Sequence, residues 1–110
     1  MKKKFVCSHQ YIEVFVGATE EFEFQRDIEL QNEVKCILVP YPFRIDHNGS
    51  QNSYNIKPTK SLTELVQETQ KVMKREYELG NCIAPHELDD FVIETIMVHE
   101  NDCANIEIGS

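Results

Sequence analysis

The clearest pattern of apolar and polar positions along the chain lies between Ser61 and Gly80. A stripe at steps of three and four runs through this segment and consists of Leu62, Leu65, Val66, Thr69, Val72, Met73 and Glu76. Most of these residues are apolar, and the spacing places them all on one face of a helix. Ser61 and Glu64 form a capping box, and Gly80 suits the left-handed residue beyond the last turn. The pattern therefore predicts a long amphipathic helix over residues 61–79, which must bury its stripe against another element.

Much of the remaining chain alternates apolar and polar residues with a period of two, as strands do. β-branched and aromatic residues are frequent in these segments, which also favours strands. Strands are predicted at 5–16, 20–25, 34–39 and 106–108. In the second of them, Phe22 and Phe24 are expected to face inward. Residues 44–56 are predicted to form a hairpin or a loop with hairpin character, because Asn48 and Gly49 supply the positive φ angles of a tight reversal.

Residues 85–99 carry signals for both a helix and a strand. Pro85 followed by acids is typical of the first turn of a helix, and the apolar spacing would let that helix continue. β-branched residues are dense in the second half of the segment, however, and they favour a strand. We therefore predict one helical turn at 85–90 and a strand at 91–99, followed by a turn at 101–105.

These elements predict an α+β fold with a single domain over residues 1–110. Its mainly antiparallel sheet of five to six strands packs on the helix at 61–79. Several predicted strands are apolar on both faces, and one helix can cover only one face. Either the sheet curls on itself or a second subunit covers the remainder, and a symmetric homodimer is the commonest arrangement of that kind. We predict a homodimer.

Composition is that of a globular protein. Hydrophobic residues make up 41% and charged residues 27% of the chain, and both values are ordinary for a folded domain. No apolar run approaches the ~18 residues of a membrane span. The lysines at positions 2–4 resemble the start of an export signal, but polar residues interrupt the run that follows them. We therefore predict a cytoplasmic protein without a membrane partner.

Cysteine and histidine residues form three short pairs near the ends of predicted segments. These pairs are Cys7-x-His9, Cys82-x-x-x-His86 and His99-x-x-x-Cys103. Thiolate and imidazole both bind zinc, and adjacent strand ends could bring two of the pairs together. The candidate metal ligands are Cys82, His86, His99 and Cys103. We favour the alternative that all four cysteines, Cys36 included, are reduced thiols that pack as small apolar groups, so no metal or cofactor is predicted.

Negative charge is concentrated near the C-terminus. The chain has a formal net charge of −8, and residues 80–110 hold seven acids but no lysine or arginine. Residues 1–79 hold all eleven basic residues and twelve acids. An acidic surface repels nucleic acid and anionic membranes and speeds encounter with a basic protein, although it can also serve solubility alone. The candidate partner-binding residues are Glu87, Asp89, Asp90, Glu94, Glu100 and Asp102.

No motif for catalysis stands out in the sequence. It lacks a glycine-rich phosphate loop, a nucleophile elbow and a paired-cysteine zinc motif. The favoured prediction is therefore a small non-enzymatic module that binds a basic protein. Its composition is similar to that of immunity proteins, antitoxins and inhibitors, which is an analogy of composition alone. One alternative is a small-ligand or metal-binding domain, and another is an enzyme with an unrecognised site built from His86, His99 and nearby acids.

Overall fold

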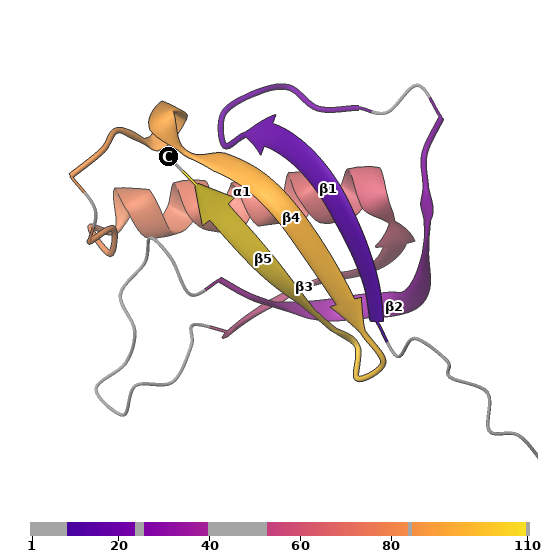
Figure 1. Ribbon diagram of the computed structural model, residues 1–110. Helices are drawn as coiled ribbons and strands as arrows, with labels where there is room; N and C mark the ends of the chain where they lie inside the picture. Colours follow the sequence, from indigo (N-terminus) through magenta and orange to yellow (C-terminus); the bar gives the residue numbers. More distant parts are fainter. Residues whose placement is uncertain (1–8, 24–25, 40–52, 84, 110) are drawn as a thin grey trace, which may run out of the picture.

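In the computed structural model, a long helix packs against one face of a five-stranded sheet (Figure 1). The structure describes residues 9–23, 26–39, 53–83 and 85–109. In chain order the elements are β1 (His9–Gly17), β2 (Glu29–Leu38), β3 (Ser53–Ser61), α1 (Leu62–Glu78), the short 3₁₀ helix η1 (Leu88–Asp90), β4 (Val92–His99) and β5 (Cys103–Gly109). The predicted α+β class with a long amphipathic helix is confirmed.

The sheet is mixed and has the strand order β1-β4-β5-β2-β3. β1 pairs with β4, β4 with β5 and β2 with β3 in antiparallel fashion, whereas β2 and β5 run parallel. The hairpin of β4 and β5 therefore inserts between the first two strands of the chain. β5 meets β2 through three register pairs, which are Cys36 with Cys103, Ile37 with Ala104, and Leu38 with Asn105. This short parallel seam joins a β1-β4-β5 unit to a β2-β3-α1 unit.

Helix α1 begins and ends close to the predicted residues, but only half of the predicted capping box is present. The Ser61 N–H donates to Thr59 Oγ1 at 2.9 Å instead of to Glu64. The Ser61 hydroxyl accepts a hydrogen bond from the Glu64 N–H at 3.2 Å, and Gly80 follows the helix with a φ of 80°. The predicted stripe contains the buried residues Leu62, Leu65, Val66, Thr69, Val72 and Met73. The Thr69 hydroxyl donates to the Leu65 carbonyl oxygen at 2.8 Å, which satisfies the polar group in this stripe. None of the helices in the described ranges is long and apolar enough to span a membrane.

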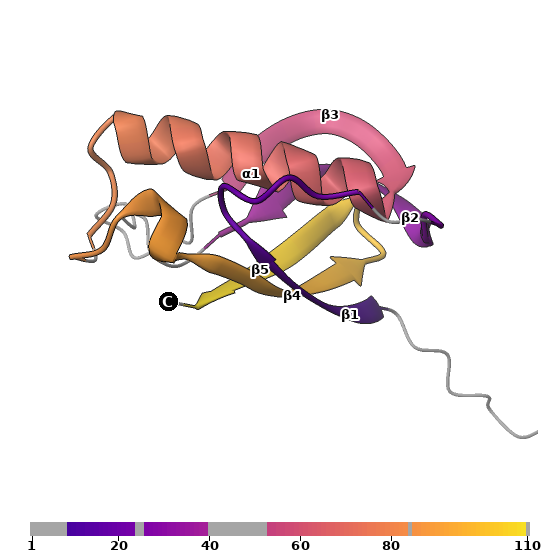
Figure 2. The same cartoon turned by 90° about the horizontal axis from the view of Figure 1, so that it is seen from above.

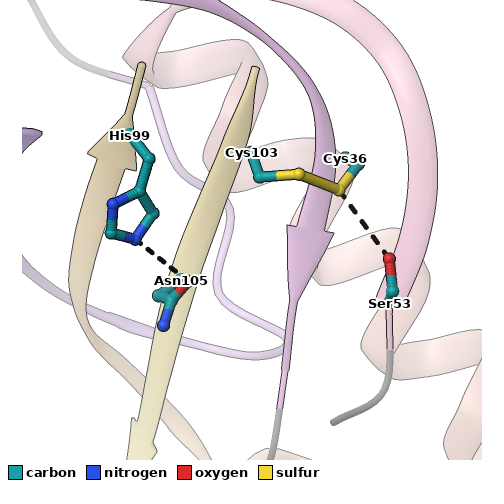
Figure 3. Close-up of a disulfide and its surroundings, with 5 residues drawn as sticks. All are labelled: Cys36, Ser53, His99, Cys103 and Asn105. Atoms are coloured by element: carbon teal, nitrogen blue, oxygen red, sulfur yellow. Dashed lines mark hydrogen bonds between the residues drawn. A yellow bond between two sulfur atoms is a disulfide. The ribbon is translucent and has the colours of Figure 1, made fainter. Parts of the chain in front are cut away.

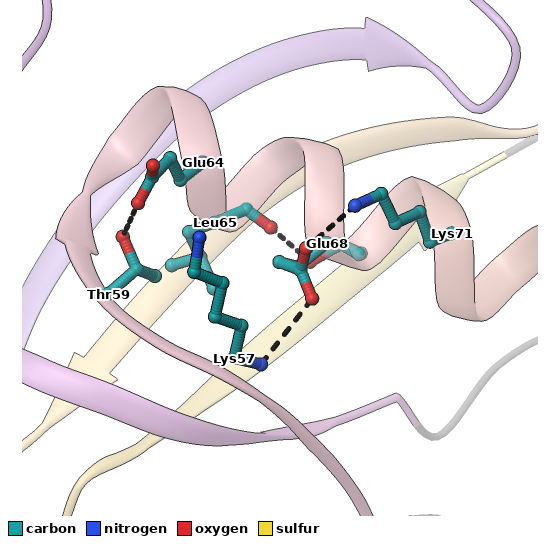
Figure 4. A network of polar contacts seen from close by, with 7 residues as sticks. Lys57, Thr59, Glu64, Leu65, Glu68 and Lys71 are labelled. Atoms are coloured by element: carbon teal, nitrogen blue, oxygen red, sulfur yellow. Dashed lines mark hydrogen bonds and ion pairs between the residues drawn. The ribbon is translucent and has the colours of Figure 1, made fainter.

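Hydrogen bonds to helix side chains connect strand β3 to α1 (Figure 4). The Thr59 hydroxyl donates to Glu64 Oε1 at 2.7 Å, and the Lys57 N–H donates to Glu68 Oε1 at 3.4 Å. β3 is an edge strand, so one of its sides has no neighbouring ladder among the described strands. Pro58, which lacks an N–H, is tolerated within β3 for that reason.

The core lies between α1 and the inner face of the sheet. Phe91, immediately before β4, heads the fully buried side chains by volume. Other residues with no exposed surface come from both layers: Val34, Ile37, Leu62, Leu65, Met73, Ile93, Ile96, Val98 and Ile106. Covering such a side chain contributes about 1.5–3 kcal/mol, so burial between these layers is the main source of stability.

The segment predicted as a strand at 20–25 is not a strand in its described part. Its first four residues run beside α1 as a loop (Figure 2), and its last two lie outside the described residues. The Gln67 amide donates to the Phe22 carbonyl oxygen at 3.0 Å, and the Gln70 amide donates to that of Glu20 at 2.7 Å. Phe22 packs partly buried against the core. Helix side chains, rather than a neighbouring strand, therefore satisfy this backbone.

The other predicted elements have shifted boundaries. The helical turn and strand predicted at 85–99 are η1 and β4, and the strand predicted at 34–39 begins earlier, at Glu29. β5 begins at Cys103 because Asp102, with a positive φ of 67°, closes a shorter turn than predicted. The predicted hairpin tip and the start of the first predicted strand lie outside the described residues.

Asp27, which lies just before β2, supports the start of α1. Its carboxylate accepts hydrogen bonds from the Ser61 hydroxyl and from the Thr63 N–H and hydroxyl, the latter two at 3.0 Å. The bond from Ser61 is the largest influence on this group and lowers the pKa of the Asp27 carboxyl, partly opposed by burial. The carboxylate therefore acts as a second cap for the helix N-terminus.

Asp27→Asn should destabilise the protein at neutral pH, because an amide oxygen accepts these hydrogen bonds less strongly than a carboxylate does. A lowered folded-state pKa stabilises the fold above the unfolded-state value of about 3.8, and that stability is lost as pH falls through the folded-state pKa. The difference in unfolding free energy between the two proteins should therefore shrink in acid. Urea unfolding across a pH series measures this difference, and a constant difference would contradict the capping role.

Candidate functional site

The acids predicted to bind a partner lie before, within and after strand β4. From one end to the other they are Glu87, Asp89 and Asp90 at η1, Glu94 within β4, and Glu100 and Asp102 in the turn to β5. β4 has eight residues and is therefore roughly 25 Å long. The first and last groups consequently lie at opposite ends of the sheet, and Glu94 lies between them.

The acids at η1 also hold local structure together. The Asp90 carboxylate accepts a hydrogen bond from the Glu87 N–H at 3.0 Å. The Tyr77 hydroxyl at the end of α1 donates to Glu87 Oε2 at 3.3 Å. The pKa of the Tyr77 hydroxyl is raised, mainly by burial and next by the negative charge of Glu87. Replacing these acids would therefore alter η1 as well as its charge.

A second group of acids lies on the outer face of the sheet, which is the side of the sheet turned away from α1. Register partners on neighbouring strands point to the same side. One row across this face contains Tyr11, Met97, Asn105, Leu38 and Ser53, and the next contains Glu13, Thr95 and Glu107. Between these rows the inward-facing Ile96 and Ile106 are fully buried. The outer face is thus a mixed surface of acids, amides and large apolar side chains.

Two aromatic side chains are prominent on β1. Tyr11 is 56% exposed and Phe15 is 60% exposed. Phe15 lies at a bulge between Glu13 and Val16 and has a φ of 50°. A positive φ is unfavourable for a bulky residue, and such backbone strain is concentrated at functional sites. The bulge therefore marks β1 as part of a candidate site.

Charge divides between the two units of the sheet. In the part of the chain that the structure describes, β1, β4 and β5 carry no lysine or arginine. The described basic residues are Arg26, Lys35, Lys57, Lys60, Lys71, Lys74 and Arg75. Three of them form ion pairs: Lys35–Glu33 at 3.8 Å, Lys60–Glu29 at 3.6 Å and Lys71–Glu68 at 3.0 Å. Glu13, Glu94 and Glu107 have no ion pair with a described residue, so the outer face keeps its negative charge.

Glu94 owes its position to the glycine at the end of β5. A Cβ atom at Gly109 would overlap the Glu94 carboxylate, so the absence of a side chain there lets Glu94 lie close over the β5 backbone. Glu107, two residues earlier in β5, accepts a hydrogen bond from the Thr95 hydroxyl. These contacts hold two of the outer-face acids on adjacent strands.

Cys36 and Cys103 form a disulfide across the parallel seam (Figure 3), which contradicts the prediction that all four cysteines are reduced. The two residues are register partners whose Cα atoms lie 4.8 Å apart, within the usual range for a disulfide. They are 67 positions apart in the chain, and sequence spacing does not reveal such a pairing. Cys82 forms no disulfide with a described residue, and Cys7 lies outside the described ranges.

The four candidate metal ligands lie in two separate places. Cys82 and His86 line a cavity of about 440 Å³ beside η1. His99 and Cys103 lie at the other end of β4, where His99 Nε2 is 3.1 Å from Asn105 Oδ1. Within the described ranges, no three or more cysteines, histidines and acids are grouped to hold a metal. The same separation keeps His86 and His99, the two histidines of the enzyme alternative, from sharing one site.

An open groove of about 770 Å³ lies between α1 and residues 18–23. Its volume is within the range of small-molecule pockets. Lys71 and Lys74 line the helix side, opposite acids of the loop. The groove also contains the amides of Gln67 and Gln70, which already donate hydrogen bonds to the loop backbone. A loop, and not the sheet, forms the second wall of this groove.

The outer-face residues of β1 were absent from the acidic surface predicted from the sequence. That prediction used the low basic content of residues 80–110, but residues 5–25 also contain no lysine or arginine. The pairing of β1 with β4 brings the two segments together and adds Tyr11, Glu13 and Phe15 to the C-terminal acids. The lack of basic residues in both segments was thus visible in the sequence. The strand order that joins the two segments was not.

Comparison of the chain with protein-family models, with curated proteins and with solved structures finds no match.

Proposed function

We propose that this protein is a small non-enzymatic module that binds a basic protein partner through the outer face of its sheet. Support comes from two exposed aromatic side chains, Tyr11 and Phe15, beside the uncompensated acids Glu13 and Glu107. Aromatic residues are enriched among the residues that dominate binding energy. Acidic residues steer a basic partner toward the surface and favour its correct orientation. The combination on one face therefore suits protein recognition.

The acids predicted from the sequence extend the same negative field beyond the outer face. Glu94 lies on this face, and the remaining acids flank it at the two ends of β4: Glu87, Asp89, Asp90, Glu100 and Asp102. This field disfavours binding to nucleic acid and to anionic membranes. Inhibition or neutralisation of a basic protein is the form of activity that this composition suggests by analogy.

Two triple variants with equal net charge test whether the outer face is the binding surface. The outer-face variant carries the substitutions Glu13→Gln, Glu94→Gln and Glu107→Gln. The control replaces three exposed acids elsewhere and is Glu21→Gln, Glu23→Gln and Glu78→Gln. The partner is first captured from host extract on immobilised wild-type protein, identified by mass spectrometry and purified. Its dissociation constant is then measured for all three proteins.

The outer-face variant should bind the purified partner at least ~10-fold more weakly than the wild type, because it loses steering and charge pairing. The control should stay within about twofold, since removal of distant charges changes only the overall field. Equal affinity for the wild type and the outer-face variant would reject the outer face as the binding surface.

The predicted homodimer and cytoplasmic location belong to this proposal as further points. The homodimer is predicted because a second subunit could cover the sheet face that α1 leaves open, and that face is the outer face. Two outer faces would bring like charges together, so a dimer through another surface fits the proposal better. Sedimentation velocity of the wild type and of the outer-face triple variant would show whether these acids affect self-association. A cytoplasmic location implies a reducing environment, where disulfides are usually transient or redox-sensing. The Cys36–Cys103 bond fits a cytoplasmic location only as a reversible bond, whereas a permanent bond would favour an oxidising compartment.

Binding of a small ligand is the second candidate function, and the volume of the groove beside α1 favours it. Lys71 and Lys74 on one wall and three glutamates of the loop on the other would suit a zwitterionic ligand that also contacts Phe22. A screen of small zwitterions by chemical-shift perturbation tests this alternative. Shifts confined to Phe22 and the two lysines would support it over the outer face.

A further inference from the structure

The Cys36–Cys103 disulfide lies at the junction between the two units of the sheet (Figure 3). The β1-β4-β5 unit carries the outer-face acids, whereas β2, β3 and α1 carry most of the described basic residues. The parallel seam has three register pairs, and the disulfide is one of them. Parallel pairing is slightly less stable per residue than antiparallel pairing. The disulfide therefore reinforces the ladder that has the fewest register pairs in the sheet.

Few hydrogen bonds among the described residues support the seam beyond its ladder. The Asp102 carbonyl oxygen accepts from the N–H groups of Lys35 and Cys36, at 2.8 and 3.3 Å. The Asn32 amide donates to the His99 carbonyl oxygen at 3.2 Å. These contacts lie at the β4–β5 turn, directly beside the disulfide. Loss of the bond would consequently affect the seam before it affects the long antiparallel pairs.

Both sulfur-bearing residues can be reached from solvent. Cys36 and Cys103 are each only partly buried, unlike the core residues Ile37 and Ala104 that follow them. They lie on the same side of the sheet as Leu38 and Asn105 of the outer face, two residues along the strands from these neighbours. The disulfide therefore borders the proposed partner-binding surface.

We propose that the Cys36–Cys103 disulfide is a reversible redox latch that regulates partner binding at the outer face. This inference rests on the proposed function. A thiolate of a reductant attacks one sulfur, the disulfide breaks, and a mixed disulfide forms with the reductant. A second thiolate of the reductant class then attacks the reductant sulfur of the mixed disulfide and releases the remaining cysteine. Two electrons and two protons thus pass from two reductant thiols to Cys36 and Cys103, which become thiols while the reductant becomes a disulfide. The opened seam lets β2 shift against β5 and changes the border of the outer face.

The latch is tested first without any partner, in a Cys7→Ser and Cys82→Ser double variant that retains only the two seam cysteines. The protein is equilibrated with mixtures of reduced and oxidised glutathione, and its thiols are trapped by alkylation and counted by mass spectrometry. The bond should be formed in oxidised glutathione and reduced in excess reduced glutathione while the circular dichroism of the fold persists. A bond that resists excess reduced glutathione, or a fold that is lost on reduction, would overturn the latch.

Hydrogen exchange then shows where reduction acts. The amides of Ile37, Leu38 and Ala104 should exchange at least ~10-fold faster in the reduced protein, because local opening sets their rates. The amides of Ile12 and Ile96, in the β1–β4 pair, should change by less than about twofold. Equal acceleration at both places, or none at the seam, would overturn a local latch.

Partner binding separates failure of the latch from failure of the proposed function. The oxidised and reduced double variants should bind the purified partner with affinities that differ at least ~5-fold, the lower end of ordinary coupling between sites. Equal affinity of the two redox states would overturn the latch but leave the outer face as the binding surface. If the outer-face triple variant also bound with unchanged affinity, the proposed function itself would fail.

Discussion

Replacing Cys36 and Cys103 together with serine should lower the free energy of unfolding by about 4 kcal/mol under non-reducing conditions. The disulfide joins residues 67 positions apart, and it therefore removes much of the conformational freedom of the unfolded chain. A loop of this length corresponds to about 4 kcal/mol in the chain-entropy model. Because folded domains are typically stable by about 5–15 kcal/mol, the variant should fold but unfold at a lower urea concentration. Equilibrium urea unfolding monitored by circular dichroism measures the loss.

Cys82→Ser is the matched control for this measurement. Cys82 takes part in no disulfide with a described residue and is partly buried, so its replacement should cost about 1 kcal/mol or less. Adding a reductant should destabilise the wild type by nearly as much as the double serine change does. Equal stability of the wild type and the double serine variant would contradict the predicted stabilisation by this bond.

Leu65→Ala should cost about 2–5 kcal/mol of unfolding free energy, because it removes apolar atoms from the interface of α1 with the sheet and leaves a cavity. Leu65 has no exposed surface in the structure. Lys71 lies on the opposite side of the same helix, with a side chain that is 74% exposed and paired with Glu68. Lys71→Ala should therefore change stability by about 0.5 kcal/mol or less. Similar losses at both positions would contradict the orientation of the helix.

The helix and its orientation could be predicted because every local signal agrees. The capping residues Ser61 and Glu64, the periodic apolar stripe and Gly80 all specify the same element, and the structure confirms its bounds to within a residue or two. The division of residues 85–99 into a turn and a strand was also predictable, because β-branched residues outweigh the helical spacing there. Local chemistry is sufficient for both of these elements.

Features that depend on contacts between distant segments could not be predicted. The insertion of β4 and β5 between β1 and β2 places β5 parallel to β2, and this step brings Cys36 and Cys103 together. The strand predicted at 20–25 failed for a related reason. Its backbone carbonyl groups accept hydrogen bonds from the side chains of Gln67 and Gln70. The segment therefore packs on the helix as a loop and does not pair in the sheet.

The candidate site was predicted in part. The excess of acids after Gly80 is visible in the sequence, and Glu94 lies on the outer face as a candidate binding residue. The aromatic residues Tyr11 and Phe15 belong to that face only because β1 pairs with β4. Their role depends on a contact between the two ends of the chain, which no periodicity within either segment specifies.

The association rate of the purified partner at increasing salt tests the acidic outer face most directly. Stopped-flow measurements would compare the wild type, the triple variant of Glu13, Glu94 and Glu107, and the control triple variant of equal net charge. The rates of the wild type and the control should fall steeply with salt, because screening weakens long-range steering. The outer-face variant should associate more slowly at low salt and depend less on salt. Identical salt dependence for all three proteins would contradict the proposed role of this face.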